Sequence, residues 1–281
     1  MDNVRFFPAL MQSFKHFAKG WLSYLGLFAL AMGVVVVMLA GVFVVGLAGS
    51  FGGDVVAIIL SVLLFAVMIA YSVWVNLSFV AFGLSQCKKK ALTLGAAIKG
   101  AFKNVWKGVV VSFYSGWYVV KWPLLIMLGM AIIVAFVAGS GMVADLMASE
   151  SQEALMNIMY DNMAALGSLG VVFALGMISS MVIFFVRILK SIFSLYVFVE
   201  QGLTGNAAVM KSVEIVKGKW WRLFFYYVLL LVGFSIINAV AVSVAESLNE
   251  YLAIVVSLLF SFAMGPVTVL FLAQVYLGWK K

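Results

Sequence analysis

Few residues in the apolar parts of this chain could carry chemistry. Lys121 stands in the run Lys-Trp-Pro, and Arg187 and Lys190 lie close together near the end of a long apolar stretch. Asn76 and Asn238 are side-chain amides in two other apolar stretches. Ionisable groups are costly in a membrane and therefore mark functional sites there. Lys121, Asn76 and Asn238 are a candidate intramembrane polar site, with hydrogen bonding between helices as the alternative role of the amides.

Two placements of Lys121 are open. A span that begins at residue 109 places this lysine in the middle of a membrane. A span that begins at Pro123 places it at the cytoplasmic interface instead. Proline is well tolerated in the first turn of a helix, which favours the interfacial placement.

The sequence predicts no catalytic residue, cofactor or metal site. Cys87 is the only cysteine and His16 the only histidine, so neither has a partner for a thiolate or imidazole metal site. No nucleophile elbow, zinc-protease or phosphate-loop motif occurs. We therefore expect a protein that is not an enzyme.

The composition excludes a soluble globule. Hydrophobic residues make up 66% of the 281 residues, charged residues make up 10%, and the mean hydropathy is +1.19. An ordinary soluble domain is roughly half apolar and about 25% charged. Lipid must therefore be the solvent for most of the chain. In such a chain the positions of the charged residues matter more than the net charge of +8. Nucleic acid is therefore not an expected partner.

The fold class predicted is all-α, a polytopic membrane protein with six transmembrane helices. About 20 apolar residues cross the hydrocarbon core of a bilayer, and each apolar run is at least that long. The N-terminus lacks the features of a cleaved signal peptide, so we expect the first span to be retained. The six runs cover approximately 21–47, 54–84, 109–140, 165–199, 221–245 and 252–278.

Basic and acidic residues lie in different connections between the predicted spans. Of the 18 basic residues, all except Lys121 lie before span one, between spans two and three, from the end of span four to span five, or at the C-terminus. The other three connections contain acidic residues and no Lys or Arg. By the positive-inside rule, both termini are cytoplasmic and the acidic loops are external. The longest of these loops, 141–163, is predicted to be an external amphipathic segment.

Three similar basic segments precede the odd-numbered spans. They cover residues 9–20, 97–108 and 208–219, and the first two align without gaps. We therefore predict a single membrane domain, 1–281, built from three helical hairpins that are each preceded by a basic interfacial helix. The approximate repeats are 1–86, 87–200 and 201–281.

The spacing of apolar residues predicts that these segments lie at the membrane surface. Leu10, Phe14 and Phe17 share one helical face, while Lys15 and Lys19 lie on others. Such a helix lies in the headgroup plane with its lysines near anionic phosphates. The candidate residues for binding a lipid headgroup or a protein partner are Lys99, Lys103, Lys107, Arg187, Lys190, Lys217, Lys219 and Arg222.

One stretch carries a resemblance to a known group. Residues 207–224, AAVMKSVEIVKGKWWRLF, resemble the signature of bacterial multipass proteins that include the membrane domain of some glycerophosphoryl diester phosphodiesterases and the YciC-like inner-membrane proteins. The last span, with Gly265-Pro266, is also similar, although the chain ends in Gly-Trp-Lys-Lys where the group has a more polar cluster. The resemblance implies a six-span domain in the bacterial inner membrane and supplies no catalytic residues.

These observations favour a non-catalytic scaffold or accessory subunit that binds anionic lipid, a cytoplasmic protein partner or a second copy of itself. The alternative is a transporter or channel for a lipid or a small amphipathic solute. The alternative predicts a polar cavity among the hairpins, lined by Asn76, Lys121, Arg187 and Asn238. The scaffold predicts a packed apolar centre with lysines at the interface.

Overall fold

The computed structural model describes residues 4–90, 92–138 and 163–280. All regular structure in these ranges is α-helical, and six helical segments are long and apolar enough to cross a membrane. The predicted all-α class with six candidate spans is therefore confirmed. Residues 141–162 of the predicted external segment lie outside the described residues, and Met163 begins α6.

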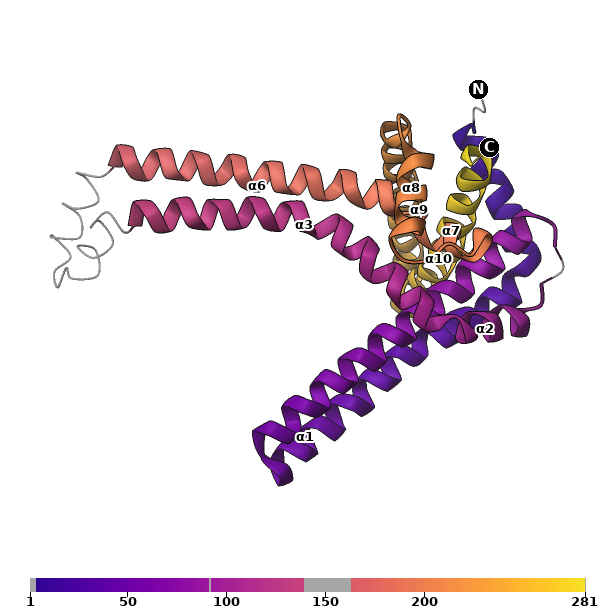
Figure 1. Ribbon diagram of the computed structural model, residues 1–281. Helices are drawn as coiled ribbons and strands as arrows, with labels where there is room; N and C mark the ends of the chain where they lie inside the picture. Colours follow the sequence, from indigo (N-terminus) through magenta and orange to yellow (C-terminus); the bar gives the residue numbers. More distant parts are fainter. Residues whose placement is uncertain (1–3, 91, 139–162, 281) are drawn as a thin grey trace. The chain divides into compact units, whose positions relative to one another are not determined.

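The first hairpin is formed by α1, Phe6–Cys87 (Figure 1). Its two arms, Phe6–Ser50 and Gly53–Cys87, are the first two candidate spans. The chain reverses at Gly53, where φ is +75°. A side chain is strained at this backbone angle, whereas glycine adopts it freely. Across the hairpin, the Tyr71 hydroxyl donates a hydrogen bond to the Leu30 carbonyl at 2.6 Å.

The remaining long helices are α3 (Val105–Ala138), α6 (Met163–Ser191), α9 (Trp220–Leu248) and α10 (Glu250–Trp279). Asn249 separates the last two, and its side chain accepts a hydrogen bond from the Tyr251 N–H at 2.8 Å, which caps α10. The described contacts divide the chain into two units, Met1–Ser115 with Lys190–Lys281, and Gly116–Leu189. The single membrane domain predicted from the sequence stays a prediction.

Three short helices belong to the first unit: α2 (Leu94–Lys103), α7 (Ser194–Gln201) and α8 (Gly205–Val216). Two of the three predicted basic segments form helices of their own, since Asn104 caps the end of α2 and Gly218, with φ +74°, follows α8. The expectation of a separate helix at 9–20 is wrong. Residues 9–20 continue into the first arm of α1 without a break, and the only non-helical backbone angles inside α1 are those of Gly53.

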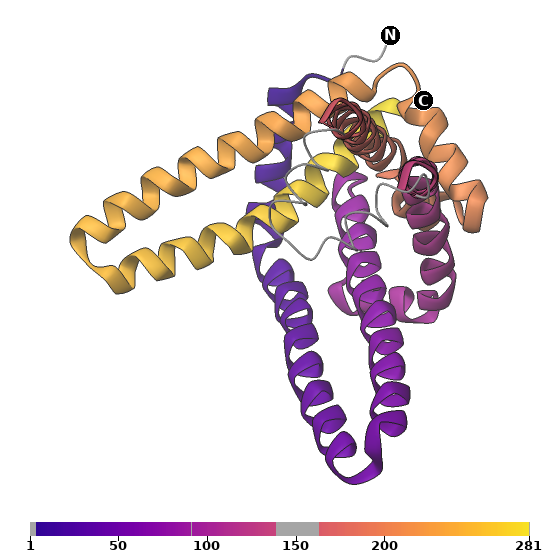
Figure 2. The same cartoon turned by 90° about the vertical axis from the view of Figure 1, so that its left-hand side faces the viewer.

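The core of the first unit lies where the hairpins of α1 and of α9 and α10 meet (Figure 2). Tyr24 and Phe82 of α1 pack edge to face at 5.1 Å between ring centroids, together with Ala97 of α2 and Leu270 of α10. By contrast, the most apolar 18 residues of each α1 arm include no buried residue. The arms therefore expose apolar side chains along their length, as a lipid-solvated surface requires.

Candidate functional site

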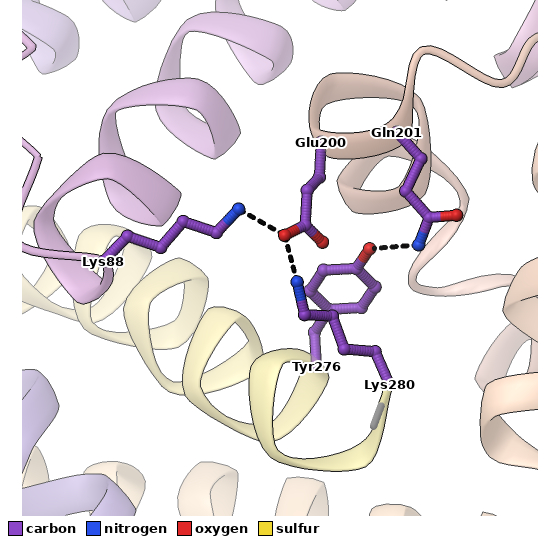
Figure 3. A network of polar contacts seen from close by, with 5 residues as sticks. All are labelled: Lys88, Glu200, Gln201, Tyr276 and Lys280. Carbon is purple, nitrogen blue, oxygen red and sulfur yellow. Dashed lines mark hydrogen bonds and ion pairs between the residues drawn. The ribbon is translucent and has the colours of Figure 1, made fainter.

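The C-terminal ends of the second, fourth and sixth candidate spans meet at one carboxylate. Lys88 follows α1, Glu200 lies in the last turn of α7, and Lys280 follows α10. Both lysines donate to Oε1 of Glu200 (Figure 3). The Glu200 side chain is 8% exposed, and the two lysines are about a quarter exposed. We call these three residues the Glu200 ion cluster.

The carboxylate is held in place by its neighbours. The Tyr276 hydroxyl lies beside it (Figure 3) and accepts a hydrogen bond from the Gln201 amide at 3.1 Å. The Tyr196 hydroxyl of α7 donates to the Val269 carbonyl of α10 at 3.1 Å. A largely buried carboxylate is stable only when it is paired and hydrogen-bonded. The two lysines supply that pairing and leave the cluster with an excess positive charge.

A cleft of about 500 Å³ adjoins this cluster, and we call it the α2 cleft. Its walls are the end of α1, the inner face of α2 and the end of α7. Its polar lining includes three lysines and one carboxylate, so the charges do not balance. The lining residues that this section uses are Lys88, Lys90, Lys107, Asn104 and Glu200, with Ala96, Ala97, Gly100 and Ala101 from α2.

Helix α2 has its own N-terminal cap and one hydrogen bond from α1. The Thr93 hydroxyl accepts a hydrogen bond from the Ala96 N–H at 3.3 Å and caps the N-terminus. The Trp74 indole donates to the Ile98 carbonyl at 3.0 Å. The inner face of α2 carries only alanine and glycine along the cleft, so its side chains leave the space open. Ala97 and Ala101 are buried on this face.

The eight predicted headgroup ligands do not share one site. Lys107 lines the α2 cleft, while Lys99 and Lys103 are exposed on α2 and are not among its lining residues. Lys219 lies with its ammonium group 5.5 Å from the Trp279 ring centroid. Lys217 is exposed at the C-terminal end of α8, Arg222 is exposed in the first turn of α9, and Lys190 is half-buried. The sequence reasoning therefore found one cleft residue of this set.

Arg187 belongs to the second unit and is engaged within it. Its guanidinium group lies 4.6 Å from the Tyr118 ring centroid and 5.6 Å from the Trp122 ring centroid. It also donates to the Tyr118 carbonyl at 2.5 Å. Pro123, one turn further on, has no N–H to offer the preceding turn of α3. Arg187 thus ties α6 to α3 at a weak point of the helix.

Of the candidate intramembrane polar residues, Asn76 and Asn238 belong to the first unit and Lys121 to the second. Asn76 is exposed, and its amide donates to the Ser72 carbonyl of its own helix at 2.8 Å. Asn238 is half-buried, and its Oδ1 has no hydrogen-bond donor among the described residues. Lys121 is half-buried inside α3, which begins at Val105. The helix begins upstream of Pro123 and is continuous through that proline, and the placement of Lys121 in the membrane or at its interface stays a prediction.

Sequence reasoning missed Lys88, Lys90 and Glu200 as site residues. The signal was present: three consecutive lysines end the second span, and Glu200 is an acidic residue next to the basic connection after span four. Their meeting depends on how three helix ends pack, which spacing does not reveal. Cys87 and His16 are both half-buried, and no group of three metal-ligating side chains comes together in the described ranges.

The fold and these exposed apolar helices are those of a multipass helical membrane protein. Comparison of the chain with protein-family models, curated proteins and solved structures gives no match. The resemblance of residues 207–224 to the phosphodiesterase membrane domain and the YciC-like proteins therefore stays a prediction.

Proposed function

We propose that this protein is a non-catalytic scaffold or accessory subunit of the bacterial inner membrane, and that it binds anionic lipid through the basic residues around α2. The observation that carries the proposal is the charge imbalance of the α2 cleft. Lys90 and Lys107 line the cleft and make no ion pair with a described residue. Glu200, the one carboxylate in the lining, is already held by Lys88 and Lys280.

A lipid phosphate suits this arrangement for two reasons. It supplies the negative charge that the protein does not provide, and each lysine near an anionic lipid surface contributes roughly 1 kcal/mol. The cleft lining also includes the apolar residues Leu77, Ala81 and Leu84 of a candidate membrane span, which suit the apolar part of a lipid. The cleft thus combines a charged edge with an apolar wall, which is the pattern of an amphiphile site.

The proposed orientation places both chain termini and the α2 cleft in the cytoplasm. It is supported by the meeting of Lys88, Glu200 and Lys280, since the ends of three alternate spans must then lie on one side. The excess of lysine at this end favours the cytoplasmic side. The acidic turn at Asp54, at the opposite end of the first hairpin, would be external.

The proposed threefold repeat has support from burial. When the three basic segments are aligned as above, Ala9, Ala97 and Ala208 occupy one position, and all are at most 5% exposed. Four residues later, the aligned side chains are again buried, in the order Ser13, Ala101 and Ser212. Equivalent faces of the three segments therefore pack inward, whether or not the segment forms a separate helix.

The proposal is tested by native mass spectrometry of the gently solubilised protein, with identification of the retained lipid. We expect wild type to retain an anionic phospholipid and the double variant Lys90→Gln/Lys107→Gln to bind it about 10- to 30-fold more weakly. The matched control is Lys15→Gln/Lys19→Gln, which removes the same charge outside the cleft. If wild type retains no anionic lipid, the proposal is wrong. Equal losses in both variants would assign binding to net charge alone.

A second candidate is transport of a lipid or small amphipathic solute, which the volume and mixed lining of the α2 cleft favour. Reconstitution in vesicles with a fluorescent anionic lipid separates the two candidates. A transporter would move the lipid between leaflets at a rate that falls in the Lys90→Gln/Lys107→Gln variant. A scaffold would leave that rate at the level of empty vesicles.

A further inference from the structure

The α2 cleft has a shape that a headgroup alone does not require. Lys90 precedes α2 and Lys107 follows it, so the two unpaired lysines flank a helix of ten residues. A helix of that length spans roughly 15 Å. Between the two lysines the cleft runs along Ala96, Ala97, Gly100 and Ala101 of α2. A phosphate is far smaller than this length, so a bound phosphate alone would leave most of the space beside α2 empty.

The wall opposite α2 is apolar. It consists of Leu77, Ala81 and Leu84 from the second arm of α1, with Phe198 and Val199 from α7. The same arm of α1 is a candidate membrane span. Leu77 and Leu84 are themselves buried, so the apolar wall belongs to the packed end of this arm and not to its exposed length.

We propose that the α2 cleft holds a single anionic phospholipid, with its phosphate at the lysine-lined edge and one acyl chain against the alanine and glycine face of α2. This inference rests on the proposed function and goes further, because it distinguishes a built site for one lipid from attraction to an anionic surface. In this site the lysines bind the phosphate, and the apolar lining of the cleft contacts the acyl chain.

Gly100 provides the sharpest test. A Cβ atom at this residue would meet no other atom within 4 Å, so the space beside it is open. Gly95 also has no atom within 4 Å of its Cβ position, lies on the same helix and is not among the cleft's lining residues. Leucine at either position replaces a glycine by a better helix former. Only leucine at 100 occupies the cleft.

The experiment measures binding of dioleoyl phosphatidylglycerol to the full-length chain in detergent by native mass spectrometry. We expect Gly100→Leu to weaken binding at least tenfold, Gly100→Ala to have an intermediate effect, and Gly95→Leu to match wild type. Thermal unfolding of each variant checks that the fold is retained. Glycerol 1-phosphate, which carries a phosphate group and glycerol but no acyl chains, should bind too weakly to be retained by wild type.

The outcomes separate the two proposals. If Gly100→Leu binds like wild type while Lys90→Gln/Lys107→Gln loses the lipid, the acyl-chain site is wrong and headgroup binding stands. If glycerol 1-phosphate binds as well as the lipid, the chain contributes nothing and this inference is also wrong. If wild type binds no anionic lipid, the proposed function fails first.

Discussion

Lys88 and Lys280 lie at the C-terminal ends of α1 and α10 and share one carboxylate oxygen of Glu200. The C-terminus of a helix carries a partial negative charge, which favours a cation there. Both lysines satisfy that preference and neutralise the carboxylate as well. Glu200 lies at the end of α7, where its own charge is unfavourable, so its position depends on the two lysines. The cluster therefore fastens the ends of three candidate spans together.

We expect Glu200→Gln to lower the free energy of unfolding by about 1–3 kcal/mol. Breaking a fully buried pair costs about 3–5 kcal/mol, and the partial exposure of the two lysines reduces that cost. Thermal unfolding in detergent, followed by tryptophan fluorescence, measures the change. The control is Glu214→Gln, whose carboxylate is 66% exposed and pairs with Lys211 on the same helix. Its effect should stay below about 0.5 kcal/mol, and equal effects would contradict the role of the cluster.

Arg187→Gln should destabilise the pairing of α3 with α6 by about 1–3 kcal/mol. The substitution removes two ring contacts and a hydrogen bond to the Tyr118 carbonyl. Arg187→Lys should restore little, because an ammonium group lacks the planar face of a guanidinium. Unfolding measurements test both variants. Lys190→Gln, on the same helix, is the charge-matched control, and full rescue by lysine would contradict the stacking role.

Substitutions at Gly33 and Tyr71 should have non-additive effects on the free energy of unfolding. A Cβ atom at Gly33 would lie 2.4 Å from the Tyr71 hydroxyl oxygen, which donates to the Leu30 carbonyl. Tyr71→Phe should cost about 0.5–1.5 kcal/mol, and Gly33→Ala should cost at least as much. Because both lose the same hydrogen bond, the double variant should cost less than the sum. Gly46→Ala, which meets no atom within 4 Å, is the control, and additive costs would contradict the prediction.

The proposed orientation predicts which thiols a membrane-impermeant reagent reaches. In a Cys87→Ser background, a cysteine at Asp54 should be labelled in intact bacterial spheroplasts, and a cysteine at Lys89 only after permeabilisation. Both residues are exposed, so burial does not limit the reaction. The reverse pattern would show that the basic connections face outward.

The proposed repeat predicts the effect of enlarging one alanine. Ala208 is fully buried, whereas its neighbour Ala207 is exposed. Ala208→Leu should lower the free energy of unfolding by about 1–3 kcal/mol through overpacking. Ala207→Leu should change it by no more than about 0.5 kcal/mol. Unfolding in detergent compares the two, and equal effects would mean that the inward face is assigned to the wrong position.

The sequence by itself determined the class of this protein. Six long apolar runs predict six helices because the hydrocarbon core requires about 20 apolar residues per crossing and closed backbone hydrogen bonding. The basic segments at 97–108 and 208–219 were also predicted as helical, since their apolar residues follow the helical period. Local patterns of this kind depend on neighbouring residues, so they can be read along the chain.

Only the tertiary structure decided which charged residues act together. Lys88, Glu200 and Lys280 are widely separated in sequence, and their meeting requires the ends of α1, α7 and α10 to pack side by side. From their spacing, Lys99, Lys103 and Lys107 were all predicted to bind a headgroup or a partner. Of these three, only Lys107 lines the α2 cleft. Composition and period assign residues to the membrane or to its surface. The face that each helix turns toward its neighbours depends on side-chain packing between distant segments, which no local pattern contains.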